Sequence, residues 1–318
     1  MLSDDPEFPT YKASYRDFLQ DTSKFRPAVE FRDESVQRKV LQTYRLQFLK
    51  DVVLSRAIDD ATFNVLNSCI IFNQIDIISH VQQEEAFLRS VVGMFIDVRW
   101  WSTIGIHGRV TPMRHAGKRS RSPTPPLDPA TLPSSVSDDQ RRDAVFLVQQ
   151  LCTMAKNVQL PARMALFRTV VEQGALHALQ WALAQGSATS DQLLTSTAGE
   201  LLTLLVEHDT AGARAHILRQ VSAIRETEKE KEQAASKSPA DAEVSHAVPQ
   251  LAQTLLSEMV RVLNSSQEWA LKSQMADSLR ILLDSPTESQ GMVGCSLLAE
   301  SPFLLLTCHF SNSQLSAL

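Results

Sequence analysis

Apolar residues recur at spacings of three and four through the first hundred positions, which is the pattern of amphipathic helices. The clearest stripe follows Asp33 and contains Val36, Val40, Leu41, Tyr44, Phe48, Leu49, Val52 and Val53. Asp60 is predicted to cap a second helix, and a third helix is expected from about residue 83 to 95. The stretch "FNQIDIIS" at 72–79 interrupts the second helix with an Asn-Gln pair, so we read it first as a helix boundary and second as a binding site.

The helical pattern returns after residue 137. Ser137 and Gln140 form a predicted capping box, Pro161 suits a first helical turn, and Gly174 suits a helix end. Further helices are expected at about 176–185, 190–208, 211–232, 247–264 and 267–284. A second capping box, Ser265 with Glu268, is predicted to open the last of them.

The segment between these helical regions has no periodicity and is rich in Ser, Pro and Arg. Such a composition buries too little apolar surface to offset the entropy of ordering, so 96–137 is predicted to be a disordered insertion. The predicted organisation is therefore helical at 1–95 and at 138–285, with a charged linker at about 233–246. Residues 286–318 form an atypical tail.

Internal similarity indicates a repeat architecture. "STAGELLTLLVE" from Ser196 aligns with "SQMADSLRILLD" from Ser273, so that Glu200 matches Asp277 and Leu202 matches Leu279. The separation is close to twice the ~40–47 residues of armadillo and HEAT units. The predicted fold is an all-α, armadillo- or HEAT-like solenoid of stacked helical hairpins.

Composition narrows the class of function. The net charge of −5 disfavours direct nucleic-acid binding, and the only nearly unbroken apolar run, "FLLLTCHF", is too short to span a membrane. No secretory signal opens the chain, and no pair of the four Cys has redox or metal-ligand spacing. Cys69 and Cys152 are expected to be buried, reduced thiols, as is usual inside cells.

No constellation of residues indicates an enzyme. The eight His are scattered without metal-ligand spacing, and no nucleophile elbow or Gly-rich loop occurs. We therefore expect no catalytic residue, no metal and no cofactor. His208 is expected to favour a helix C-terminus, and Trp181 and Trp269 are expected in the core.

Two sets of residues are candidates for binding partners. An Asn on a groove-facing helix can both donate to and accept from an extended peptide backbone, although a helix cap or a bond within the scaffold is the simpler interpretation. The first set is Asn64, Asn67, Asn73 and Gln74. The second is a basic, import-like segment with Arg114, Lys118, Arg119 and Arg121, followed by phosphorylation candidates Ser122 and Thr124.

Several segments resemble the central region of protein phosphatase 4 regulatory subunit 3, the SMEK family. They are "DPEFPTYKASYRDFLQDTSKF", "TYRLQFLKDVVLSRAIDDATFNVLNSCIIFNQIDIISHVQ", "EEAFLRSVV", "AKNVQLPARMALFRTVVEQGALHALQWAL" and "KSQMADSLRILLD". The resemblance implies a non-catalytic scaffold that joins a phosphatase 4 catalytic subunit and a second regulatory subunit to protein substrates. It also implies a location in nucleus and cytoplasm and roles that include DNA-damage recovery.

The chain departs from this family in three places. The family's EVH1-type domain precedes the "DPEFP" stretch, which here begins at residue 4, so we expect that domain to be missing. The insertion at 96–137 and the tail from residue 288 do not follow the family pattern. An importin-like adaptor that binds basic peptides is the alternative function, and a truncated chain that folds poorly is a third reading.

Overall fold

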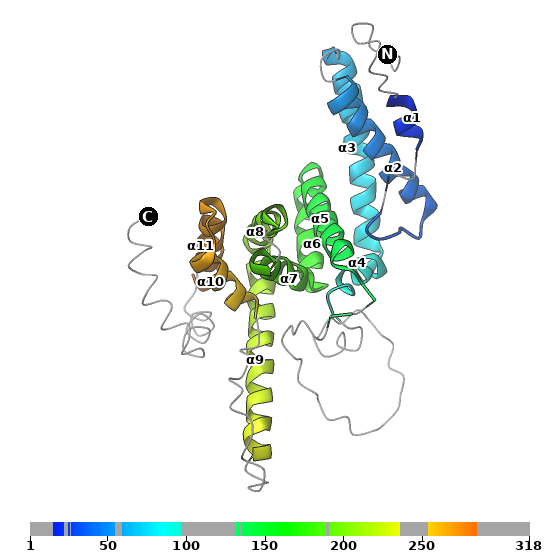
Figure 1. Ribbon diagram of the computed structural model, residues 1–318. Helices are drawn as coiled ribbons and strands as arrows, with labels where there is room; N and C mark the ends of the chain where they lie inside the picture. The colour runs from blue at the N-terminus through cyan, green and yellow to red at the C-terminus, as the bar shows by residue number, and fades with distance from the viewer. Residues whose placement is uncertain are drawn as a thin grey trace, which may run out of the picture. The chain divides into compact units, whose positions relative to one another are not determined.

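The computed structural model describes residues 15–21, 25, 27–54, 59–96, 132–133, 135–188, 191–235 and 254–284. Every regular element within these ranges is a helix, which confirms the all-α solenoid class (Figure 1). The chain divides into two compact units. Unit 1 comprises Met1–Val91 and Gln150–Leu166, and unit 2 comprises Val92–Gln149 and Phe167–Leu318.

Unit 1 is built around a helical hairpin. Helix α1 spans Tyr15–Gln20, α2 spans Glu34–Phe48 and continues as a π-helical turn at Leu49–Val53, and α3 spans Asp60–Gln83. Helix α4 spans Glu85–Val92, and a short 3-10 turn at Ala155–Asn157 packs against α3. Helices α2 and α3 pack along each other, and the buried apolar residues of α3 are Ile70, Ile77, Ile78 and Val81.

The starts of α2 and α3 follow from side-chain caps. Asp33 Oδ1 accepts a hydrogen bond from the Ser35 amide at 2.7 Å, and Asp59 Oδ1 accepts one from the Thr62 amide at 2.6 Å. These bonds satisfy amides that have no partner inside the helix. The prediction that Asp60 is the cap is therefore wrong by one residue.

Helix α3 runs without a break through "FNQIDIIS", so the predicted helix boundary at 72–79 is wrong. Gln74 falls on the same helical face as Ile70 and Ile77, and its side chain is buried. Asn157 donates from Nδ2 to Gln74 Oε1 at 2.7 Å, which offsets the penalty of burying that amide. The polar interruption in the sequence is thus a contact within the scaffold.

Unit 2 contains the longer run of helices. Its elements are α7 (Ala175–Ala188), α8 (Gln192–His208), α9 (Thr210–Ala235), α10 (Leu255–Ser265) and α11 (Trp269–Leu283). Helices α5 (Asp138–Met154) and α6 (Leu160–Glu172) each contribute residues to both units. Helix α7 packs against α8 and α10, and α8 also packs against α9 and α11.

The predicted internal repeat corresponds to two matching hairpins, α7–α8 and α10–α11. In the first pair α7 ends at Ala188 and α8 begins at Gln192. In the second pair α10 ends at Ser265 and α11 begins at Trp269, so the loop between the two helices has the same length in both pairs. Gly199 permits the close approach of α8 to α11, because an added Cβ would lie 2.4 Å from Leu271 Cδ1.

The structure confirms two of the predicted helix ends and contradicts a third. The Ser137–Gln140 box is present, with the Gln140 amide donating to Ser137 Oγ at 3.2 Å and the Ser137 amide donating to Gln140 Oε1 at 3.0 Å. Gly174 follows α6 with a φ of 95°, which few other residues adopt. The Ser265–Glu268 box is wrong: α11 begins after Glu268 without a side-chain cap. The capping box in this region is Thr254 with Ser257, at the start of α10.

Two expectations of burial are also wrong. Trp181 is buried as predicted, but Trp269, the first residue of α11, is 66% exposed. Cys152 is buried, whereas Cys69 is exposed because it lies on α3 opposite the packed face. Cys295 and Cys308 lie outside the described residues.

The proposed limits of the insertion, the linker and the tail stay predictions. Residues 97–131, 236–253 and 285–318 lie outside the described ranges. No described helix has both the length and the apolar character needed to cross a membrane.

Candidate functional site

The most unusual surface of unit 1 is a line of exposed side chains on α3. Val65 is 62% exposed and Phe72 is 67% exposed, and the exposed Cys69 lies between them. These residues are spaced i, i+4 and i+7, so they share one side of the helix. We call Val65, Cys69 and Phe72 the α3 stripe. It faces away from Ile70 and Ile77, which lie on the packed side.

Exposed aromatic and β-branched side chains in a row are informative, since isolated ones are common but aligned ones mark contact surfaces. Phe63, which lies in line with Ile70 on the opposite side of the same helix, is also exposed, and the Lys50 ammonium lies 5.5 Å from the centre of its ring. Asp76 continues the line of the stripe by one turn and pairs with Lys39 of α2.

The four polar candidates on α3 differ in their exposure and in their hydrogen-bond partners. Asn64 is exposed at the edge of the stripe, where its carbonyl accepts a bond from Ser68 Oγ at 2.8 Å. Asn67 and Asn73 are half-buried, and Asn73 Nδ2 is buried without a hydrogen-bond partner. Gln74 is engaged by Asn157. A peptide-binding role for these residues stays a prediction, and Asn64 is the member most accessible to a partner.

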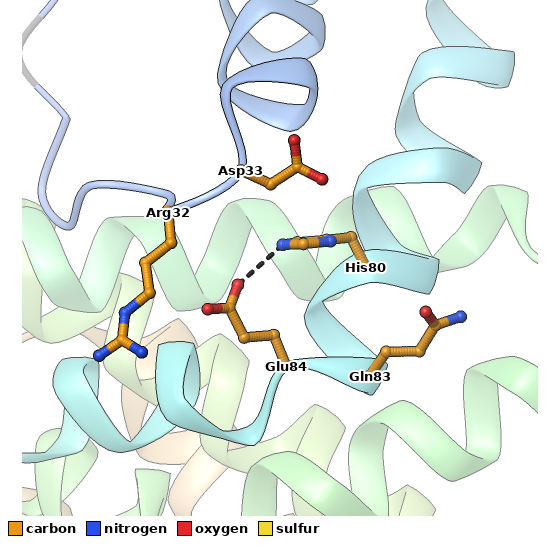
Figure 2. Close-up of a pocket in the computed structure, with 5 residues that line it drawn as sticks. All are labelled: Arg32, Asp33, His80, Gln83 and Glu84. Carbon is orange, nitrogen blue, oxygen red and sulfur yellow. Dashed lines mark hydrogen bonds and ion pairs between the residues drawn. The ribbon is translucent and has the colours of Figure 1, made fainter.

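A second feature of α3 is an open cleft of about 440 Å³ near its C-terminal end, lined by Arg32, Asp33, His80, Gln83 and Glu84 (Figure 2). The imidazole of His80 lies between the carboxylates of Asp33 and Glu84, and its Nε2 is 2.8 Å from Glu84 Oε2. Hydrogen bonds from Ser35 lower the pKa of Asp33, with a smaller contribution from His80. The cleft therefore holds fixed charges of both signs rather than an activated nucleophile.

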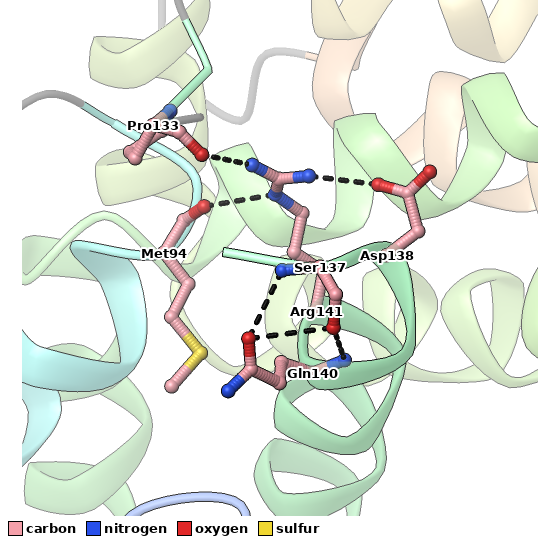
Figure 3. A network of polar contacts seen from close by, with 6 residues as sticks. All are labelled: Met94, Pro133, Ser137, Asp138, Gln140 and Arg141. Atoms are coloured by element: carbon pink, nitrogen blue, oxygen red, sulfur yellow. Dashed lines mark hydrogen bonds and ion pairs between the residues drawn. The ribbon is translucent and has the colours of Figure 1, made fainter. Parts of the chain in front are cut away.

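Unit 2 contains a polar contact that joins residues on either side of the segment 97–131 (Figure 3). The Arg141 side chain donates from Nε to the Met94 carbonyl at 3.0 Å and from a terminal nitrogen to the Pro133 carbonyl at 2.7 Å. Its other terminal nitrogen pairs with Asp138 at 2.7 Å. Arg141 is buried, so this guanidinium holds two distant parts of the chain together.

The basic import-like segment and the phosphorylation candidates lie within 97–131, outside the described residues. They are Arg114, Lys118, Arg119, Arg121, Ser122 and Thr124. Their proposed roles stay predictions.

Unit 2 also buries two imidazoles against each other. The rings of His177 on α7 and His216 on α9 lie edge to face, with centroids 4.5 Å apart. Burial lowers the pKa of His177 to about 3, with Arg219 adding to the effect. Burial, together with His177 and Arg219, places the pKa of His216 well below its usual value. Both side chains are neutral at neutral pH.

The described residues hold no group of three or more His, Cys, Asp or Glu that could bind a metal ion. His208 ends α8 and stacks on Phe167 with centroids 4.3 Å apart, which fits a structural role. The described helices and their packing define the class of protein: an all-α protein of solenoid type.

The family model for phosphatase 4 regulatory subunit 3 matches residues 1–299, and the chain belongs to this family. This confirms the resemblance seen in the sequence. The family is described as a regulatory subunit and not as a phosphatase, which confirms the expectation of a non-catalytic class.

Three relatives extend the comparison. An uncharacterized protein of Schizosaccharomyces pombe is 29% identical over 287 residues, covering 90% of this chain and 27% of that protein. Suppressor of Mek1 from Dictyostelium discoideum is 30% identical over 174 residues, covering 54% of this chain and 13% of that protein. Serine/threonine-protein phosphatase 4 regulatory subunit 3 from Drosophila melanogaster is 26% identical over 211 residues, covering 65% of this chain and 17% of that protein.

The matched regions thus span between 13% and 27% of these relatives' lengths. No solved structure gives a significant match.

The α3 stripe was missed by the sequence reading, which followed Phe63, Leu66, Ile70 and Ile71 as the apolar side of the helix. A signal was present, because Val65, Cys69 and Phe72 form a second line at helical spacing on the other side. The packed side of α3 carries Ile70, Ile77 and Ile78, whereas Val65, Cys69 and Phe72 are exposed.

Proposed function

We propose that this chain is a non-catalytic scaffold of a serine/threonine protein phosphatase 4 complex, in which it mediates assembly and substrate targeting through protein–protein contacts. The observation that carries the proposal is the family match over residues 1–299. The partners would be the phosphatase 4 catalytic subunit, a second regulatory subunit and protein substrates. The complex would act in nucleus and cytoplasm, including in the response to DNA damage.

The packing of the helices is consistent with a scaffold. Contacts between neighbouring hairpins, such as α7–α8 against α10–α11, fix side chains on a framework whose backbone hydrogen bonds are internal. Exposed side chains such as Val65 and Phe72 are then presented without an ordering penalty for the helix that bears them.

The importin-like alternative would require tryptophans at matching exposed positions of successive repeats. Trp181 is buried on α7 and Trp269 is exposed at the start of α11. These two residues occupy different positions in the two matching hairpins, so no described feature favours that function.

Binding of the purified chain to a purified phosphatase 4 catalytic subunit tests the proposal. The chain is first shown to be folded by circular dichroism, then mixed with the catalytic subunit, with and without a second regulatory subunit, and analysed by size-exclusion chromatography. We expect co-elution in at least one mixture, and no phosphatase activity from the chain by itself. Separate elution of a folded chain in both mixtures would refute the assembly role.

A further inference from the structure

Hairpins α7–α8 and α10–α11 stack on each other through one side of α8. Gly199 of α8 lies directly against side chains of α11. One turn further along α8, Thr203 Oγ1 lies 3.0 Å from the Ser278 hydroxyl of α11. Leu202 and Val206 lie on the same side of α8, at i+3 and i+7 from Gly199, so they belong to the contact between the two hairpins.

The equivalent side of α11 is less completely covered. Ser196 of α8 aligns with Ser273 of α11, and the same shift of 77 residues aligns 202 with 279 and 206 with 283. Leu202 and Val206 are 0% exposed, whereas their counterparts Leu279 and Leu283 are half-buried. The repeat therefore contains a contact that the first hairpin makes completely and the second makes only in part.

Two further pairs of positions show the same difference. Gly199 is buried and its counterpart Ala276 is half-buried. Leu183 of α7 is fully buried and its counterpart Val260 of α10 is half-buried. We call these four counterparts the α11 outer face, which consists of Val260, Ala276, Leu279 and Leu283.

The stacking of the first hairpin indicates what kind of element covers such a face. In a solenoid each unit buries its apolar side against the next unit, and α11 is the last element of the described structure (Figure 1). The corresponding side of α8 is covered by a helix. A helix satisfies its own backbone hydrogen bonds, whereas an extended chain would leave N–H and C=O groups unpaired against apolar side chains.

The chain itself supplies a segment with the sequence of such a helix. Residues 285–318 follow α11 directly and lie outside the described residues, so only their sequence enters the argument. Ser301 and Pro302 precede the apolar run "FLLLTCHF", as the N-cap and the first residue of a helix would. Phe303, Leu306 and Phe310 are spaced i, i+3 and i+7, which places them on one side of that helix.

The length of this segment fits the α11 outer face. A helix over residues 302–318 would be about 25 Å long, close to the length of about 22 Å for the 15 residues of α11. The 17 residues from 285 to 301 can span up to about 55 Å, so this helix can reach the α11 outer face in either direction.

The charges of the segment are compatible with the same face. Lys272 and Arg280 border the α11 outer face, and Arg280 pairs with Asp277 at 3.4 Å. Residues 285–318 contain two Glu and no Lys or Arg, so the segment brings no like charge against the two cations. Covalent attachment gives the segment an effective concentration on the order of millimolar, which favours it over a second copy of the chain in dilute solution.

We propose that the segment 302–318 packs as a helix on the α11 outer face, with its apolar side against Leu279 and Leu283. The segment then covers the side of hairpin α10–α11 on which another helical unit would stack. A partner that binds by stacking on this hairpin has to displace the segment first. The docking of the segment is independent of the proposed function.

The test uses the full chain with one reporter thiol on the α11 outer face, introduced by Ala276→Cys. The rate of its reaction with maleimide is measured by peptide mass spectrometry. The exposed Cys69 is the internal standard, and rates in concentrated urea correct for differences in intrinsic reactivity. The reporter chain is compared with the same chain carrying Leu306→Ser. Leu305→Ser is the matched control, because residue 305 lies on the opposite side of the proposed helix.

We expect the reporter thiol to react about tenfold more slowly than Cys69, or slower still. Leu306→Ser should raise its rate by about tenfold or more, and Leu305→Ser should change it by less than about twofold. Both serine substitutions lie outside the described helices, and circular dichroism checks that each chain is folded. Leu283→Cys replaces the reporter if the Ala276→Cys chain does not fold.

Three results would overturn the proposal. The first is a reporter thiol that reacts as fast as Cys69 in the folded chain. The second is an equal effect of Leu306→Ser and Leu305→Ser, or no effect of either, because the segment would then not be what covers the face. The third is protection that disappears on dilution, which would assign the α11 outer face to a second copy.

Discussion

Mild acid should destabilise unit 2 through the buried pair His177 and His216. Burial favours the neutral imidazole, so the folded-state pKa of His177 lies at about 3 and that of His216 lies well below its usual value. In the unfolded chain both return to a pKa of about 6.5. Below that pH the unfolded state binds more protons than the folded state, so stability falls as the pH falls from about 6.5 towards 3.

The size of the effect follows from this difference. At pH 5.5, one unit below the unfolded pKa, each His that stays neutral in the folded state lowers the free energy of unfolding by about 1.4 kcal/mol relative to its value at a pH well above 6.5. The two residues together contribute about 2.7 kcal/mol between pH 7.5 and pH 5.5. For a unit of this size, that loss corresponds to about 5–10 °C in the melting temperature. Arg219 adds a positive charge near both imidazoles and so acts in the same direction.

Hydrogen exchange of peptides from α7 and α9 at the two pH values measures the effect where it arises, after correction for the intrinsic pH dependence of exchange. A His177→Leu, His216→Leu double variant should lose most of the pH dependence, and His216→Leu should lose about half. His208→Gln is the control, because His208 stacks on Phe167 outside this pair. The reasoning is refuted if the native chain and the double variant show the same dependence on pH.

Three further outcomes are expected. Arg141→Ala should lower the free energy of unfolding by about 2–4 kcal/mol, measured by urea denaturation, because two carbonyls lose a charged donor. Gly199→Ala should destabilise by up to about 2 kcal/mol in the same assay, since the new methyl group collides with the side chains of Leu271 and Gln274 and the higher helix propensity of Ala offsets only part of that cost. Cys69 should react with maleimide within minutes while Cys152 stays protected, because burial raises the pKa of the Cys152 thiol to about 12; peptide mass spectrometry distinguishes the two.

Each of these outcomes has a matched comparison. Arg142→Ala should have a smaller effect than Arg141→Ala, since the Arg142 side chain is 41% exposed and pairs with Asp191 near the surface. Ser196→Ala is the comparison on α8, because Ser196 already carries a Cβ and the substitution adds no atom that could collide. Equal losses within either pair, or equal labelling of the two cysteines in the folded chain, would contradict the structural explanation.

Local patterns in the sequence were enough to define most helices. Stripes at three- and four-residue spacing depend only on the geometry of one helix, so α2, α8 and α11 are recognisable without their neighbours. The capping pair Ser137–Gln140 and the turn at Gly174 are equally local, because their hydrogen bonds and backbone angles involve adjacent residues. The similarity between the sequences of α8 and α11 was visible for the same reason.

Features that depend on distant residues were not predictable in this way. The break expected at Asn73 and Gln74 is absent, and the side-chain oxygen of the buried Gln74 accepts a hydrogen bond from Asn157, far along the chain. The exposure of Trp269 and Cys69 likewise depends on which sides of α11 and α3 find a neighbour. Helical periodicity shows that a line of side chains is apolar, but it does not show what covers that line.

The sequence by itself therefore determined the helices, their repeat and the family to which the chain belongs. The tertiary structure alone decided which apolar lines are core and which are surface, and so exposed the α3 stripe. It also decided which buried polar groups are paired, as at Gln74, and which are held neutral, as at His177. The physical reason is that burial and hydrogen-bond satisfaction depend on contacts between helices, whereas helix formation is encoded over a few neighbouring residues.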